Sequence, residues 1–140
     1  MRTIEILTII IYGFVGVISL IMATKSLFAK KYLVFHEKAA AIEWTEIDKR
    51  LQYVILALLR ISGLGFLVTA LILLVFPIVN YFVQDEFVRY SIPVLAFIFC
   101  SGLFIINYSL YKQSKSITPW KGSLFAMIAI IAGIILSVLQ

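Results

Sequence analysis

The sequence predicts an all-α fold, an integral membrane four-helix bundle, from three observations. Of the 140 residues, 63% are hydrophobic and 14% are charged, whereas about a quarter of the residues in a soluble domain are charged. Four stretches without any charged residue are each about 19 residues or longer, enough to cross a hydrocarbon core of about 30 Å. Basic residues cluster beside these stretches, which is typical of segments that flank a membrane.

The uncharged stretches define the expected organisation of the chain. We expect one transmembrane domain over residues 1–140, with approximate spans 5–24, 51–79, 90–111 and 121–139. Pro77, Pro93 and Pro119 lie near the ends of apolar runs, where a missing backbone N–H costs least. We therefore predict that the second helix ends at about Phe76 and that no proline interrupts the centre of a helix.

The distribution of basic residues predicts the orientation of the helices. Loops 25–50 and 112–121 carry nine of the twelve basic residues, whereas the opposite side has only Arg2 and Arg89. Positive charge near apolar spans tends to stay in the cytoplasm. We expect both loops to be cytoplasmic and both termini to lie on the outer side.

The first loop is the only place where titratable side chains concentrate. Thr45 followed by Asp48 has the spacing of a helix N-cap with an acidic third residue, so we predict that the second helix starts at Thr45. That helix would project about two turns into the cytoplasm before it enters lipid. The stretch 37–42 contains three alanines, and we expect it to form a short helix near the membrane surface.

Arg60 is the one full charge within an apolar run, and a charge at the centre of a membrane helix costs about 2.5 kcal/mol or more. Two interpretations stay open. The guanidinium can snorkel toward the head groups, because helix side chains lean toward the N-terminus. Alternatively it faces the bundle and pairs with a polar group such as Asn107, which we place at similar depth on the third helix. Glu5 lies near the opposite face and is not the expected partner.

Small residues recur along the fourth predicted helix. Ala129, Gly133 and Ser137 are spaced four apart and make one flat face, which allows close helix packing in lipid. We interpret this face as packing the four helices into one bundle. The alternative is a homo-oligomer that forms through the same three residues.

Several functions are not expected from the composition. His36 stands alone, without the spacing of a metal site, so we expect no metal and no cofactor. The single Cys100 forms no CxxC motif. The basic residues lie beside apolar spans and do not spread over a soluble face, so we expect no nucleic acid partner.

A series of residues in the first loop and the second helix carries a resemblance. The chain resembles a group of small uncharacterised bacterial four-helix membrane proteins, which implies a bacterial origin and a shared fold but no activity. The matching positions cover about a quarter of the chain; they are His36, Ala39, Trp44, Asp48, Gln52, Ala57, Arg60, Gly63 and Gly65.

These observations lead to one expected function and two alternatives. We expect a non-enzymatic protein of the bacterial inner (plasma) membrane that binds an anionic lipid, a small amphiphile or a protein partner at a cytoplasmic polar cluster. The alternatives are a small transporter or channel, disfavoured because we count only Thr69, Cys100, Ser101 and Ser137 as polar in the outer half, and an interfacial enzyme using His36 and Asp48 as acid and base. The expected ligand-binding residues are His36, Trp44, Asp48, Gln52, Arg60 and Asn107.

Overall fold

The computed structural model describes residues 2–139, which form helices and contain no β-strand. The element order is α1 (Arg2–Leu27), α2 (Val34–Ala40), a short 3-10 helix η1 (Trp44–Glu46), α3 (Lys49–Val83), α4 (Glu86–Ser114) and α5 (Trp120–Val138). Helices α1, α3, α4 and α5 are long and apolar enough to span a membrane. The prediction of four long apolar helices is thus confirmed by length and composition.

Each long helix extends to or beyond most of its predicted bounds, and two prolines lie inside helices. Helix α3 continues past Pro77 to Val83, and Pro93 is the eighth residue of α4. The prediction that the second helix ends at Phe76 is therefore wrong. The fixed φ of proline is compatible with a helix, and long apolar helices tolerate the lost hydrogen bond when neighbouring groups compensate for it.

The predicted start of the second long helix is also corrected. Thr45 belongs to η1, and α3 begins four residues after it, at Lys49, with Asp48 as its N-cap. The carboxylate of Asp48 accepts a hydrogen bond from the backbone N–H of Arg50 at 2.9 Å. The short helix expected over 37–42 starts three residues earlier, as α2, and is followed by its C-cap Ala41, which has the left-handed conformation with φ 53°.

Close helix contacts in the bundle depend on two glycines. A Cβ at Gly16 would lie 2.8 Å from Cγ of Leu74, so Gly16 lets α1 approach α3. A Cβ at Gly133 would overlap the Tyr12 ring, so Gly133 lets α5 approach α1. The buried residues at the middle of the bundle come from all four long helices; they are Tyr12, Val15, Leu73, Ala96, Cys100 and Ile130.

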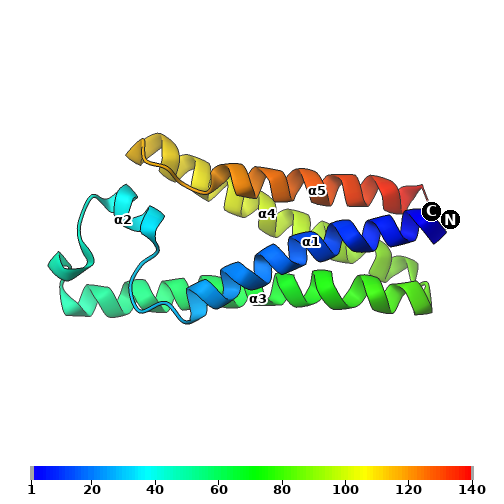
Figure 1. Ribbon diagram of the computed structural model, residues 1–140, viewed down its shortest axis with the longest axis horizontal. Helices are drawn as coiled ribbons and strands as arrows, with labels where there is room; N and C mark the ends of the chain where they lie inside the picture. Colours follow the sequence, from blue (N-terminus) through cyan, green and yellow to red (C-terminus); the bar gives the residue numbers. More distant parts are fainter. Residues whose placement is uncertain (1, 140) are drawn as a thin grey trace.

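The two ends of the bundle differ in shape (Figure 1). The start of α1, the end of α5 and the α3–α4 turn lie together at one end, where the helices converge. Toward the other end, α4 and α5 diverge from α3, and α2 with its connections lies between them. We call these the terminal end and the loop end. Helix α3 has 35 residues and extends past the last turn of the 26-residue α1 at the loop end.

Candidate functional site

The structure brings Gln52, Trp44 and Asp48 together at the start of α3. The Nε2 of Gln52 donates hydrogen bonds to the carbonyls of Trp44 at 2.7 Å and Ile47 at 3.1 Å. The Trp44 ring packs edge-on against Tyr32, with ring centroids 5.1 Å apart. Because the polar atoms of Gln52 and Asp48 bond to nearby backbone, these residues hold η1 and the first turn of α3 in place.

Asn107 has a similar anchoring role in the other connection at the loop end. Its Nδ2 donates to Oγ of Ser123 at 3.1 Å. Its backbone carbonyl accepts a hydrogen bond from Oγ1 of the buried Thr118 at 2.9 Å. The first bond joins α4 to α5 and uses the side chain expected to pair with Arg60, and the second ties the α4–α5 connection to α4.

Arg60 is exposed, and within residues 2–139 its guanidinium makes no hydrogen bond or ion pair. Gly63, one turn away, packs on the last turn of α1, since a Cβ there would lie 3.0 Å from the Leu27 nitrogen. Arg60 therefore lies beyond the end of α1. It is two residues from Leu58 and from Ser62, and residues two apart do not share a helix face. The charge thus points away from the surface that Leu58 and Ser62 line.

That surface bounds a cavity of about 490 Å³ between α3, the first loop and α4, which we call the loop-side cavity. Apolar groups dominate its lining, with His36, Tyr32 and Ser62 as the polar exceptions. The lining residues are Tyr32, His36, Ala39, Ala40, Ile42, Ile47, Leu51, Ile55, Leu58, Leu59, Ser62 and Leu110. Of the six predicted ligand-binding residues, only His36 lines this cavity.

Two titratable side chains of the first loop line the cavity. Burial lowers the pKa of His36 below its usual 6.5, which favours the neutral imidazole. Burial raises the pKa of Tyr32, and the charges of Glu37, Glu43 and Glu46 add to the effect. The Tyr32 hydroxyl donates a hydrogen bond to the carbonyl of Ile42. The polar part of the lining is therefore uncharged at neutral pH.

A second, smaller pocket lies at the terminal end, and we call it the terminal pocket. It has a volume of about 40 Å³ and is lined from all four long helices. Its polar lining residues are Glu5, Thr8, Tyr12, Asn80, Tyr81, Gln84, Arg89 and Ser137. The sequence-based count of polar residues in the outer half did not include the first seven.

These polar residues cannot be identified as one group from the sequence of any single helix, because they lie near the ends of different helices. Glu5 is in the first turn of α1, Arg89 is the fourth residue of α4, and Ser137 is next to last in α5. The topology was the available signal. In an antiparallel bundle of four helices, the start of α1, the end of α5 and the α3–α4 turn lie at the same end. That topology alone places these polar side chains at one level.

Within residues 3–139, no group of three or more His, Cys, Asp or Glu side chains is arranged to hold a metal ion. The sequence matches no protein-family model, and no match was found among curated proteins or solved structures.

Proposed function

We propose that this chain is a non-enzymatic, multi-pass protein of a bacterial inner membrane that binds an anionic amphiphile in the loop-side cavity. In this proposal loops 25–50 and 112–121 are cytoplasmic and both termini lie outside, following the excess of basic residues on the loop side. The ligand's apolar chain occupies the cavity, and its acidic head group lies among the lysines of the loops.

The observation that carries the proposal is the size and lining of the cavity. Its volume of about 490 Å³ falls in the range of about 300–1,000 Å³ typical of small-molecule sites. Leu51, Ile55 and Leu58 lie on one side of α3, and Ala39 and Ala40 of α2 face them across the cavity. An extended hydrocarbon chain is the ligand that such a lining favours, because burial of apolar surface is favourable by about 25 cal/mol per Å².

Charge supports an acidic head group. Lys30 and Lys31 are exposed and directly precede Tyr32, which lines the cavity. A carboxylate or phosphate at the edge of the cavity would interact favourably with these ammonium groups. Arg60 does not belong to this arrangement, since it leaves α3 on the other side.

The test is binding of a dansyl-labelled fatty acid to the purified full chain, with Ser62→Phe as the variant. Ser62 lines the cavity and is exposed, so phenylalanine fills ligand space without disturbing a packed core. The matched control is Ile61→Phe, because Ile61 is exposed but does not line the cavity. We expect Ser62→Phe to weaken binding about tenfold or more, equivalent to about 1.4 kcal/mol, and Ile61→Phe to bind like the unaltered protein.

The head group is tested with the matching dansyl-labelled primary alcohol. The acid should bind more tightly than the alcohol, and added salt should narrow the difference, because exposed charges are screened. Equal affinities of Ser62→Phe and Ile61→Phe, or no saturable binding by the unaltered protein, would refute the proposal.

A small transporter is the second candidate function, favoured by the polar terminal pocket at the end opposite the cavity. Between the two lies the buried layer formed by Tyr12, Val15, Leu73, Ala96, Cys100 and Ile130. Transport would require the helices to separate at this layer. Flux of the labelled fatty acid across proteoliposome membranes would favour the transporter over a binding protein.

A further inference from the structure

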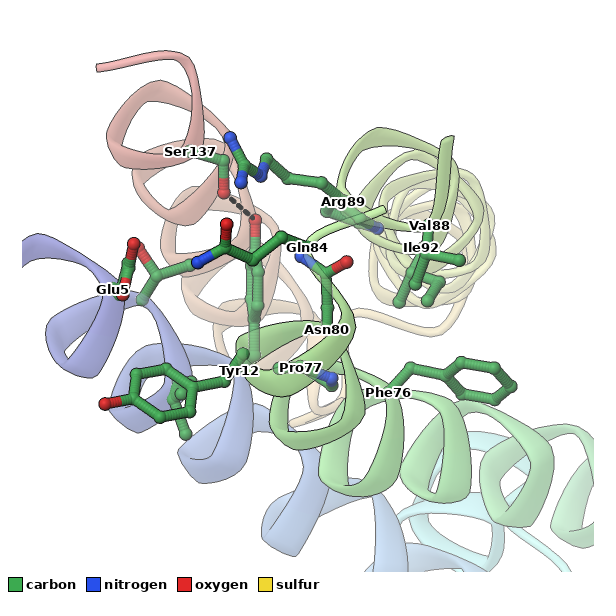
Figure 2. A pocket seen from close by; sticks show the side chains of 14 residues that line it. Glu5, Tyr12, Phe76, Pro77, Asn80, Gln84, Val88, Arg89, Ile92 and Ser137 are labelled. Carbon is green, nitrogen blue, oxygen red and sulfur yellow. Dashed lines mark hydrogen bonds between the residues drawn. The ribbon is translucent and has the colours of Figure 1, made fainter. Parts of the chain in front are cut away.

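The terminal pocket places an acidic and a basic side chain on opposite walls. Figure 2 shows Arg89 reaching from α4 toward the end of α5, and Glu5 entering from α1. Gln84 lies between them. Both charged side chains are partly buried. They form no salt bridge with each other among the described residues, so each presents its charge to the pocket.

Arg89 carries an unsatisfied donor. Its Nε is buried and has no hydrogen-bond partner within the described residues. Leaving a buried donor unpaired costs about 1–3 kcal/mol, and more for a charged group. The guanidinium is a planar fork that matches two oxygens of a carboxylate or a phosphate. Arg89 therefore favours an oxyanion as its partner.

The neighbouring wall of the pocket offers hydrogen-bond acceptors. Ser137 donates its hydroxyl proton to the carbonyl of Gly133 at 2.9 Å. The 3.4 Å contact between Tyr12 and Ser137 must then have the Tyr12 hydroxyl as donor, which leaves the phenol oxygen to accept. Together with the Glu5 carboxylate, this oxygen suits a primary ammonium, which has three donors and no acceptor.

We propose that the terminal pocket binds the phosphoethanolamine group, with its phosphate on Arg89 and its ammonium on Glu5 and Tyr12. A simple anion would be repelled by Glu5, and a simple cation would be repelled by Arg89. The volume of about 40 Å³ is about three times the minimum for one water molecule, so the pocket takes charged atoms of a head group and excludes acyl chains. The group can come from a phospholipid of the bilayer or from free phosphoethanolamine. This proposal does not depend on the loop-side cavity.

The experiment is native mass spectrometry of the full chain with phosphatidylethanolamine, phosphatidylcholine and phosphatidylglycerol of identical acyl chains. Phosphatidylcholine keeps both charges but its ammonium has no N–H donors, and phosphatidylglycerol has no cation. We expect phosphatidylethanolamine to be retained about tenfold more strongly than either, the ratio that corresponds to one hydrogen bond to a charged group.

Four variants assign the selectivity to side chains. Glu5→Gln should bring phosphatidylethanolamine and phosphatidylglycerol to similar retention. Arg89→Gln should lose binding of both, and Arg89→Lys, which keeps the charge but loses the planar fork, should weaken binding of all three lipids. Glu86→Gln is the matched control, since Glu86 is exposed, lies on the same turn of α4 and does not line the pocket.

A competition arm distinguishes the two sources of the head group. Displacement of the phospholipid by millimolar free phosphoethanolamine supports a soluble ligand in the same site, and retention of the phospholipid supports a bilayer source. Equal retention of all three lipids, a preference for phosphatidylethanolamine unchanged in folded Glu5→Gln, or lipid retention unchanged in folded Arg89→Lys, would overturn the proposal and leave water as the partner of Arg89. Thermal unfolding of each variant verifies that it is folded.

Discussion

The two ends of the bundle use the same helices in different ways. At the terminal end, side chains from α1, α3, α4 and α5 surround a pocket of about 40 Å³. At the loop end, a cavity of about 490 Å³ separates α3 from α2 and from Leu110 of α4. The terminal pocket is small and has eight polar lining residues, whereas the loop-side cavity is large and mostly apolar.

Small residues explain much of this difference. Near the terminal end, Gly133 and Ser137 of α5 receive the ring and hydroxyl of Tyr12, which is 3% exposed. At the loop end, Gly63 brings α3 close only to the last turn of α1. The face with Ala129, Gly133 and Ser137 thus packs within the chain, because Ala129 also packs against the buried core, and a homo-oligomer through this face stays a prediction. The helices are therefore closest where a glycine permits contact, because apolar surface alone does little to join helices in lipid.

The largest effect should come from closing the space that Gly133 provides. Gly133→Ala should destabilise the protein by about 1–3 kcal/mol, because the new Cβ overlaps the rigid Tyr12 ring and α5 must move away from α1. Thermal unfolding in detergent measures the change. Gly122→Ala on the same helix meets no atom within 4 Å and should have little effect; an equal loss in both variants would contradict the proposed role of the close contact.

The next largest effect on stability is expected from the hydrogen bonds of Gln52 at the start of α3. Gln52→Ala removes hydrogen bonds to the carbonyls of Trp44 and Ile47 and should cost about 1–2 kcal/mol locally. Hydrogen exchange of residues 44–52 should accelerate while exchange near Tyr12 stays unchanged. The control is Gln113→Ala, whose side chain makes one exposed contact of 3.4 Å with Ser109; slower or unchanged exchange in Gln52→Ala would show that these bonds do not hold η1.

A smaller effect on stability is expected from the protonation of His36. Because burial lowers its pKa in the folded state, the unfolded state takes up the proton first as pH falls. The stability gained from the neutral imidazole is present above pH 6.5 and decreases as pH falls below that value, toward the lowered folded pKa. Unfolding temperatures measured from pH 7.5 to pH 5.5 should decrease in the unaltered protein and change less in His36→Leu. Identical slopes in the two proteins would remove His36 as the cause.

The smallest effect is expected for Arg60→Leu. Arg60 was among the ligand-binding residues predicted from the sequence, but it is exposed and leaves α3 away from the loop-side cavity. We therefore expect less than a twofold change in affinity for the dansyl-labelled fatty acid, within the range usual for surface substitutions. A tenfold loss would restore the polar cluster around Arg60 and move the binding site to the opposite face of α3.

Local signals predicted the helices better than their ends. Uncharged runs predicted four long apolar helices, and α1, α3, α4 and α5 confirm them. The start of α3 was predicted at Thr45 but lies after Asp48. Both residues are good N-caps, and Thr45 belongs to the 3-10 helix η1 that precedes α3. Pro77 and Pro93 were expected outside helix interiors, but neighbouring helices can compensate for the missing donors.

The candidate site was harder to predict, because it depends on which faces and which ends meet. His36 was expected in the site and lines the cavity, whereas Gln52, Asp48 and Asn107 use their side chains to hold local backbone and connections. Glu5 and Arg89 lie 84 positions apart in the sequence. Nothing in the residues around either one indicates that they line the same pocket.

The sequence by itself determined that there are four long apolar helices and that basic charge gathers in the loops on one side, because hydrophobic length and local charge depend on neighbouring residues alone. Only the tertiary structure decided that α5 packs on Tyr12, that Arg60 is exposed and that Glu5 and Arg89 face one pocket. Those outcomes depend on helix rotation and separation, which small contacts between distant residues fix.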